Sequence, residues 1–556
     1  MNAEVGSDPG LNGGEVVLET LRSRGIDTLF FVAGGTFITV MEALSRANDI
    51  RGVPMRLESS ATFAAETYAA VNKRAAAVFV TRAPGAANAV IGVHTAMQAS
   101  RPMVLFVANI PGPMKQREAF QELDYNQVYG PVAKAVFEVH RYEQLADVVA
   151  RACDLAESGR PGPVVVAVGR DLLDGQTGNP VIPPPAVQVH HGMDASVAAS
   201  IAERIQNASH PIVLAGEMVA HEMAHGDLVK LAERTGAGVL AAYRQQDVIN
   251  NLHPAYFGHL TLNRLQHVED ALDACDLLVC IGSRLDSVTT QDYAFQREGQ
   301  ALIVVYPDSS VMSQWQPAVA ASASARSALS AIAAATPGTP PADRIAWRDE
   351  IHGREAAFAD ASAANVYGDV NLAHVIAEFR ERVPDDSIVV SDAGTFGRWL
   401  HRYYPSTQPD TNLGPVSGAM GYGVPGGVGA QVARPDRAVF VWVGDGGFLM
   451  TGHDAVVMVQ ERLPVKIIVC DNSAWGSIMV SAQSRFPGME YGTRLQSPDF
   501  ARIAEGYGMP SFRVRQTAEF SDALTQALAT DGPALVHLLL DARDVSPYAG
   551  GPKAAD

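Results

Sequence analysis

Short apolar segments alternate with amphipathic segments along most of this 556-residue chain. The apolar segments have the length of strands, whereas the segments between them carry apolar residues at three- and four-residue spacing, as helices do. This alternation predicts parallel sheets covered by helices, so the expected fold class is α/β. The clearest strand candidates are 77–81, 103–108, 163–168, 212–216, 277–283, 301–307, 388–392, 438–444, 465–471 and 534–541, and the clearest helix candidates are 59–73, 196–206, 225–235 and 520–529.

Two proline-rich stretches divide this pattern into three parts. Residues 179–187 (NPVIPPPAV) and 336–343 (TPGTPPAD) lack periodicity, and proline is a poor residue for the interior of a helix or strand. A single hydrophobic core rarely supports a chain of this length, so several domains are expected. We therefore predict three doubly wound parallel-sheet domains at 11–178, 190–335 and 345–548.

The charge balance excludes some classes of partner. Lys plus Arg number 42 against 60 Asp plus Glu, a formal net charge of −18, which disfavours nonspecific binding to nucleic acid or anionic membranes. The apolar runs are much shorter than the roughly 20 residues that cross a bilayer, and residues 1–14 lack the pattern of a signal peptide. The 4 cysteines show no metal-binding spacing, so buried free thiols are expected. We therefore expect a cytoplasmic protein without nucleic-acid or membrane partners.

The strongest local signal is an acidic, glycine-rich turn after an apolar strand. The strand at 438–443 leads into GDGGF at 444–448, and Asn472 follows the strand at 465–471. Adjacent parallel strands place such residues at one edge of a sheet, where open α/β sheets bind ligands. Asp445 and the asparagine offer the hard oxygen ligands that Mg²⁺ takes together with phosphate oxygens, and glycines let backbone N–H groups approach a phosphate. Either residue alone would also fit an ordinary turn, so the prediction of a metal and phosphate site depends on their joint spacing.

This pair of motifs resembles the thiamine diphosphate-dependent enzymes, whose hallmark is GDG followed by an asparagine-containing turn. Here the hallmark stands as GDGGF at 444–448 and DNSAWGS at 471–477, and the second asparagine often found in the family is Ser473. The resemblance implies that Mg²⁺ is held by the side chains of Asp445 and Asn472 and by the backbone carbonyl of Ala474.

The resemblance extends over nearly the whole chain. The segment 56–74 is similar to the family segment whose glutamate contacts the aminopyrimidine ring, and Glu58 is the matching residue. Segments 81–103 and 117–134 resemble the next two landmarks, and in 414–430 the resemblance implies that Met420 holds the thiazolium and pyrimidine rings in a V. The cofactor-binding residues implied by the resemblance are Gly34, Gly35, Glu58, Pro84, Asn88, Thr395, Phe396, Gly418, Met420, Gly444, Asp445, Gly446, Gly447, Asn472, Trp475 and Gly476.

The resemblance also implies the catalytic residues. Glu58, hydrogen-bonded to N1′ of the aminopyrimidine, would favour the tautomer that takes the C2 proton of the thiazolium. AFQE at 119–122 is similar to the matching segment of acetolactate synthases, which implies that Phe120 and Gln121 border the substrate, with Gln121 as a second catalytic residue and Ile478 as a further pocket residue. In isolation, Glu58 would also fit a first-turn helix residue and Met420 a core residue.

Two absences narrow the reaction. Simple 2-oxoacid decarboxylases of the family that the chain resembles often carry a His-His pair in the first part and a glutamate shortly after the turn matching 475–476. Here residues 111–127 contain no histidine and residues 478–481 no carboxylate, so the resemblance argues against a dedicated proton-delivering decarboxylase. The expected activity is acetolactate synthase-like decarboxylation of a 2-oxoacid, pyruvate or an analogue, with carboligation to an oxoacid or aldehyde. A benzaldehyde lyase-like or acyl-coenzyme-A lyase-like enzyme, and a plain 2-oxoacid decarboxylase, remain alternatives. The middle part of the chain shows little of the glycine-rich flavin signature of biosynthetic acetolactate synthases, and the segment 243–260 resembles the wider family in general, which argues against FAD.

Two readings outside this class also remain open. A nucleotide-binding oxidoreductase would show GxGxxG after a strand with an acidic residue about 20 positions later, and no clean example occurs. A noncatalytic cofactor-binding protein would explain Leu57, where the family commonly has histidine, and the unusual sequence at 33–35. The resemblance implies sites shared between subunits, and hence a homodimer or homotetramer.

Overall fold

The computed structural model describes residues 10–175, 177–185 and 191–548. Parts of two predictions lie outside these residues, namely the beginning of the N-terminal segment and the end of the first linker. The chain forms two compact units, Met1–Gln188 and Val189–Asp556. No helix among the described residues is long and apolar enough to cross a membrane. All four cysteines are buried free thiols, as predicted.

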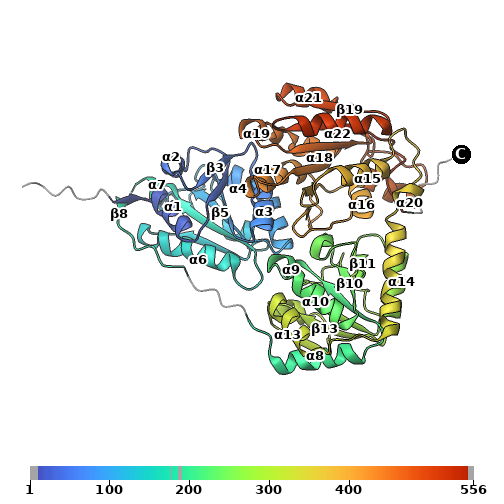
Figure 1. The fold of residues 1–556 in the computed structure, drawn as a ribbon. Helices are drawn as coiled ribbons and strands as arrows, with labels where there is room; N and C mark the ends of the chain where they lie inside the picture. Colours follow the sequence, from blue (N-terminus) through green and yellow to red (C-terminus); the bar gives the residue numbers. More distant parts are fainter. Residues whose placement is uncertain (1–9, 176, 186–190, 549–556) are drawn as a thin grey trace, which may run out of the picture. The chain divides into compact units, whose positions relative to one another are not determined.

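The first unit, coloured blue to cyan in Figure 1, is built on a six-stranded parallel sheet. The strand order of this sheet is β3-β2-β4-β5-β7-β6. Its inner strands β5 and β7 are buried along their whole length, and their apolar residues form one continuous core with the covering helices. A short antiparallel pair, β1 and β8, joins the two ends of the unit. The elements of this unit are β1 (Leu11–Asn12), α1 (Gly13–Ser23), β2 (Thr28–Phe31), α2 (Ile38–Arg46), β3 (Arg51–Pro54), α3 (Glu58–Asn72), β4 (Ala76–Val80), α4 (Ala83–Gln98), β5 (Met103–Asn109), α5 (Tyr125–Tyr129), β6 (Ala135–Val139), α6 (Leu145–Glu157), β7 (Pro163–Gly169), α7 (Arg170–Asp174) and β8 (Thr177–Gly178).

The second unit begins with a central parallel sheet whose strand order is β11-β10-β9-β12-β13-β14. In chain order this reads 3-2-1-4-5-6, the doubly wound order with a switch point between its two middle strands. The elements are α8 (Ala195–Asn207), β9 (Pro211–Ala215), α9 (Glu217–His221), α10 (His225–Thr235), β10 (Gly238–Ala241), β11 (Tyr256–His259), α11 (Gln266–Ala274), β12 (Leu277–Ile281), β13 (Ala301–Val305), α12 (Ser309–Met312), β14 (Val319–Ala321), α13 (Ala325–Ala335) and α14 (Ala342–Phe358).

The third sheet lies in the same unit and has the order β16-β15-β17-β18-β20-β19. Relative to chain order this is 2-1-3-4-6-5, which is also the order of the sheet in the first unit. The elements are α15 (Leu372–Arg382), β15 (Ile388–Ser391), α16 (Phe396–Tyr403), β16 (Asn412–Leu413), α17 (Gly423–Ala433), β17 (Val439–Gly444), α18 (Asp445–Thr451), α19 (Ala455–Gln460), β18 (Lys466–Asp471), α20 (Gly476–Arg485), α21 (Phe500–Gly506), β19 (Ser511–Val514), α22 (Phe520–Ala529) and β20 (Ala534–Leu539).

Three parallel sheets flanked by helices confirm the predicted fold class. Every predicted strand is present, and its ends differ from the prediction by at most two residues. The sequence analysis missed short strands such as β3 and β14, which are partly exposed and therefore lack a continuous apolar run. Each predicted domain range contains one six-stranded sheet, and the exact domain boundaries stay predictions.

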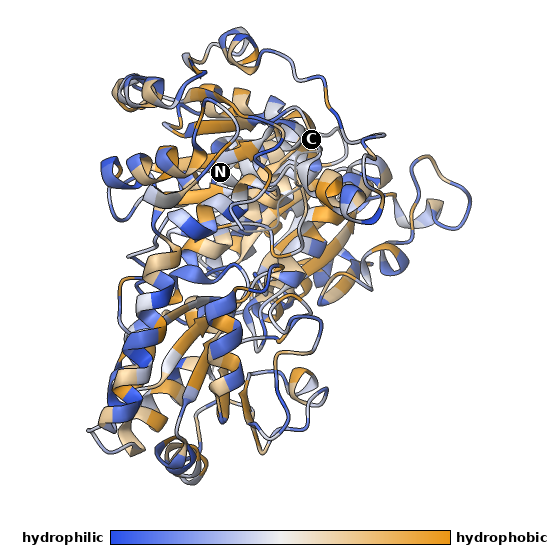
Figure 2. Cartoon of the chain, turned by 90° about the vertical axis from the view of Figure 1, so that its right-hand side faces the viewer, coloured by the Kyte–Doolittle hydropathy of each residue, from blue (hydrophilic) through white to orange (hydrophobic). Residues whose placement is uncertain are grey.

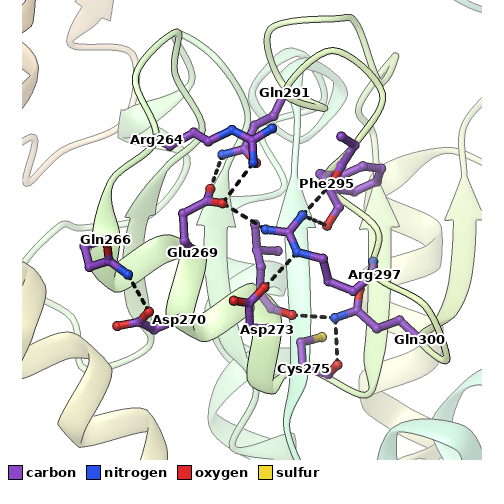
Figure 3. Close-up of polar contacts among 12 residues, drawn as sticks. Arg264, Gln266, Glu269, Asp270, Asp273, Cys275, Gln291, Phe295, Arg297 and Gln300 are labelled. Atoms are coloured by element: carbon purple, nitrogen blue, oxygen red, sulfur yellow. Dashed lines mark hydrogen bonds and ion pairs between the residues drawn. The ribbon is translucent and has the colours of Figure 1, made fainter.

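Hydrophobic residues concentrate along the strands, whereas the helices carry both hydrophilic and hydrophobic residues (Figure 2). In the central sheet, polar contacts fasten the loop that follows β12 to α11 (Figure 3). Arg297 donates hydrogen bonds to Asp273 at 2.8 Å and to Glu269 at 2.9 Å, and Gln291 donates to the other oxygen of Glu269 at 2.6 Å. This loop in turn supports Tyr243, whose backbone N–H donates to Thr289 Oγ1 at 3.2 Å.

Candidate functional site

A cavity of about 280 Å³ lies at the carboxyl edge of the third sheet. Strands β17 and β18 are parallel neighbours with Gly444 opposite Cys470, so Asp445 and Asn472 leave the sheet side by side. The predicted residues that line this one cavity are Thr395, Phe396, Gly418, Met420, Gly444, Asp445, Gly446, Gly447, Asn472, Ala474, Trp475, Gly476 and Ile478. Every site residue predicted in the third domain is therefore brought together.

Asp445 is the first residue of α18 and is buried. Burial, together with the nearby charge of Asp471, raises the pKa of Asp445 to about 6. Burial also opposes ionisation of Asp471, but hydrogen bonds from His537 and Ser497 lower the pKa of that carboxyl group. Two neighbouring buried carboxyl groups favour a bound cation, because it offsets their mutual repulsion.

The oxygen donors around Asp445 suit a hard divalent ion. No group of three His, Cys, Asp or Glu among the described residues could hold a metal, so a metal here needs amide and carbonyl oxygens as well. The side chain of Asn472 lines the cavity and makes no hydrogen bond within the described chain. The carbonyl oxygen of Ala474 accepts from Gly476 N–H at 2.9 Å, and a second lone pair remains on it. This donor set fits Mg²⁺.

Residues 493–495 hold the turn at 473–475, which carries the carbonyl group of Ala474. The backbone N–H of Trp475 donates to Thr493 O at 2.8 Å, and Leu495 N–H donates to Ser473 O at 2.8 Å. The ring of Trp475 packs against Gly446, where an added Cβ would lie 2.2 Å from Cζ3. The sequence suggested that this glycine lets the backbone approach a phosphate, and the structure adds the packing of Trp475 as a second requirement.

Asp392 is a buried residue that the sequence analysis did not single out. It follows β15, and its carboxylate accepts hydrogen bonds from the backbone N–H groups of Ala393 at 2.6 Å, Gly421 at 3.0 Å and Gly423 at 3.1 Å. Gly421 directly follows Met420 and Gly423 lies three residues after it, so Asp392 fixes the turn that presents Met420 to the cavity. The sequence did contain one signal that could have identified Asp392, namely an acidic residue at the end of an apolar strand.

We predict that Asp392→Asn weakens cofactor binding and removes a pH dependence of stability. The amide cannot accept as many backbone N–H groups, so half-saturation by the cofactor should rise about tenfold. Burial raises the pKa of Asp392 from 3.8 to about 6. The folded state therefore holds this proton more tightly, and ionisation costs about 3 kcal/mol of stability, which is absent below pH 4 and fully present above pH 6.

Urea unfolding between pH 4 and 7 measures this cost. The wild-type protein should lose stability from this group as pH rises from 4 to 6, whereas the Asn variant should lack that slope. Asp349→Asn is the control, because the side chain of Asp349 is 53% exposed in the same unit. An unchanged slope together with unchanged cofactor affinity would contradict the role given to Asp392.

A second group of predicted residues lies at the carboxyl edge of the sheet in the first unit. Glu58 is the first residue of α3 and is 8% exposed. Its Oε2 accepts a hydrogen bond from Asn88 Nδ2 at 3.0 Å, and Oε1 lies 2.9 Å from the position of a Cβ on Gly85. Pro84 stands in the first turn of the same helix, α4. The structure thus brings Glu58 and Asn88 into contact through close approach of α3 and α4.

Gly34 and Gly35 follow β2 at this edge. A Cβ on Gly34 would lie 3.1 Å from Thr81 Cβ, and Thr81 also lies against Gly85 beside Glu58. Gly35 faces open space. The loop after β5 carries Phe120 and Gln121, the side chain of Phe120 is 77% exposed, and Gln121 has a positive φ of 64°. The substrate roles of these two residues stay predictions.

Sequence comparison relates all three parts of the chain to one family. The N-terminal TPP binding domain of thiamine pyrophosphate enzymes matches residues 11–128. The central domain of the same family matches residues 198–332, and its C-terminal TPP binding domain matches residues 392–538. Together these matches cover more than half of the chain.

Curated relatives and a solved structure resemble the chain over nearly its whole length. A probable acetolactate synthase large subunit of Methanocaldococcus jannaschii is 26% identical, with 97% of this chain and 93% of that protein covered. The acetolactate synthase isozyme 2 large subunit of Escherichia coli K12 is 27% identical, with 96% of each covered. A Rhodococcus jostii RHA1 thiamine diphosphate-dependent 4-hydroxybenzoylformate decarboxylase shares the fold, with a TM-score of 0.84 at 24% identity over 96% of this chain and 99% of that one.

Proposed function

This chain belongs to the family of thiamine pyrophosphate enzymes, and from that premise we propose that it decarboxylates a 2-oxoacid in a Mg²⁺-dependent reaction and joins the remaining acyl unit to a second carbonyl compound. Pyruvate or a close analogue is the proposed donor. The observation that supports this most is the single cavity shared by Asp445, Asn472, Ala474 and Met420.

The cavity residues would hold the cofactor at its diphosphate end. Asp445 and Asn472 would hold Mg²⁺ through side-chain oxygens and Ala474 through its carbonyl oxygen, and the ion would neutralise charge on the diphosphate. Backbone N–H groups at 446 and 447 and the wall formed by Thr395 and Trp475 enclose that group. The other proposed contacts at this end are Phe396, Gly418, Gly444 and Gly476.

Glu58 would act at the other end of the cofactor. When bound, thiamine diphosphate supplies the nucleophilic carbon that adds to the carbonyl group of the substrate. The carboxyl group of Glu58 shares a proton at N1′ of the aminopyrimidine, and Asn88 keeps that carboxyl group in place. Gly34, Gly35 and Pro84 border this ring. Each complete site would combine the Glu58 region of one subunit with the Asp445 region of another, in a homodimer or homotetramer in the cytoplasm.

Two observations favour carboligation over simple decarboxylation. Residues 478–481 at the start of α20 carry no carboxylate to protonate the acyl unit, and Ile478 lines the cavity instead. The curated relatives that match nearly the full chain are named as acetolactate synthases. Phe120 and Gln121 would complete the substrate pocket, with Gln121 contacting the reacting group.

We further propose that the enzyme works without FAD. The switch point of the central sheet lies between β9 and β12, and Glu217 is the first residue of α9, the helix that follows β9. Glu217 accepts a hydrogen bond from Arg284 N–H at 3.2 Å and from Tyr306 O–H at 2.8 Å. A buried carboxylate at this crevice repels the diphosphate of a dinucleotide, which would otherwise bind there.

A substrate panel tests the proposed reaction. We expect pyruvate or a close analogue, supplied with thiamine diphosphate and Mg²⁺, to release carbon dioxide and yield a product with a new carbon–carbon bond, identified by mass. Added FAD should leave the rate unchanged. An aldehyde as the sole product would identify a plain decarboxylase, and cleavage of acyloins or of an acyl-coenzyme-A would identify a lyase.

A further inference from the structure

The cavity of the third sheet extends to a group of cationic and polar side chains from two domains. Tyr243 and Arg244 come from the segment after β10, and Arg398 and His401 come from α16. These four residues, here called the cationic arm, line the same cavity. The Arg244 guanidinium lies 5.6 Å from the ring centre of Tyr243, and its charge acts on His401.

Arg398 has no counter-ion within the described residues. It makes no side-chain hydrogen bond or salt bridge there, and burial lowers its pKa. Asp544, a carboxylate that lines the same cavity, accepts backbone N–H groups of Tyr367 at 2.8 Å and Gly368 at 2.9 Å instead. A cation that loses solvent without gaining a partner is costly, so its position calls for a ligand.

Arg244 gives the arm a second fixed charge. It is 7% exposed, and it donates to Ser391 Oγ at 2.7 Å and to the backbone carbonyl of Asp392 at 3.4 Å. The carboxylate of Asp392 is already occupied by backbone N–H groups. Arg244 therefore donates hydrogen bonds to neutral oxygens, and the nearby Asp392 carboxylate offsets part of its positive charge.

The two histidines near the cationic arm, His401 and His259, carry no charge near pH 7. Burial, with Arg244 nearby, holds the pKa of His401 well below its usual value, and burial lowers the pKa of His259 to about 4. Both are neutral near pH 7. His401 Nε2 has no hydrogen-bond partner within the described residues, so it offers a further polar contact to a bound group.

We propose that the cationic arm is an anion-binding subsite, which takes a carboxylate or phosphate group carried by the far end of the substrate or by a separate ligand. Arg398 supplies the free guanidinium, whose planar fork matches either group, and Arg244 supplies a fixed positive field. The subsite gives the enzyme selectivity for acidic over neutral ligands of the same length. Binding of the substrate's anionic group at this subsite rests on the proposed function, whereas binding of a separate anion there does not.

A titration without turnover tests the subsite. The protein, saturated with thiamine diphosphate and Mg²⁺, is titrated with glutarate, inorganic phosphate and neutral glutaramide, and tryptophan fluorescence is recorded because Trp475 lines the cavity. We expect saturable binding of at least one anion and none of glutaramide. Arg398→Met should weaken that binding about 10- to 100-fold, and Arg398→Lys should restore part of it. Arg502→Met is the matched control, because the Arg502 side chain is 80% exposed in the same unit.

Kinetics distinguish the two sources of the anion. If the substrate carries it, glutarate competes with the 2-oxoacid, and Arg398→Met lowers kcat/KM for 2-oxoglutarate about 10- to 100-fold while 2-oxopentanoate changes less than about twofold. If a separate ligand carries the anion, inorganic phosphate should bind without competing with the 2-oxoacid. Failure of all 2-oxoacids to react would refute the proposed function only. Three results would overturn the subsite, namely absence of anion binding, equal binding by Arg398→Met, or a tenfold weaker affinity of that variant for thiamine diphosphate. The last result would mean that Arg398 serves the cofactor.

Discussion

Asp445→Ala should lower kcat/KM by about a thousandfold or more and remove the dependence of activity on Mg²⁺. The carboxylate lies beside the unpaired amide of Asn472 at the carboxyl ends of adjacent strands. The two other carboxylates near the cavity are held by other partners, Asp471 by His537 and Asp544 by backbone N–H groups. Loss of the metal's interaction with the diphosphate is expected to cost several kcal/mol of transition-state stabilisation. Activity and cofactor binding are measured across a Mg²⁺ titration.

The control for this variant is an exposed aspartate of the same unit. Asp436 has a side chain that is 64% exposed and pairs with Arg434, so Asp436→Ala should keep full activity. Asp445→Ala should remain folded, because the substitution removes a buried carboxyl group whose pKa is raised by burial. The midpoint of urea unfolding checks this. Full activity of Asp445→Ala with unchanged Mg²⁺ dependence would refute the metal site.

Glu58→Gln should lower kcat by about 10²- to 10⁴-fold, the range for loss of a positioned acid or base. The glutamine keeps an oxygen that accepts from Asn88 Nδ2, so the packing between α3 and α4 should survive. Half-saturation by Mg²⁺ should stay within about twofold, because the proposed metal ligands lie elsewhere in the sequence. Steady-state kinetics at saturating cofactor separate the two quantities.

Glu42→Gln serves as the comparison for Glu58→Gln. The Glu42 side chain is 53% exposed and pairs with Arg46 on α2, so this change should leave kcat unaltered. If Glu58→Gln kept kcat within about twofold of wild type, then Glu58 would be only a buried helix-start residue.

The sequence alone was sufficient to predict features that depend on neighbouring residues in the chain. The apolar run before Asp445 and the run before Asn472 predicted two strands, and parallel pairing then required their ends to share an edge. The glycine at 446 was identifiable from the motif, but its contact with Trp475 was not. Asp392 escaped notice, because its partners Gly421 and Gly423 lie some thirty residues away in sequence.

The sequence by itself determined the α/β class and most of the inner strands, because strand periodicity acts over a few residues. Its motifs also led to the residues of the proposed metal site. The tertiary structure decided the edge strands, the anchoring of the Met420 turn by Asp392, and the meeting of Arg244 with Arg398 and His401 at one cavity. These arise from contacts between segments distant in sequence, and such contacts depend on how helices and sheets pack rather than on any local pattern.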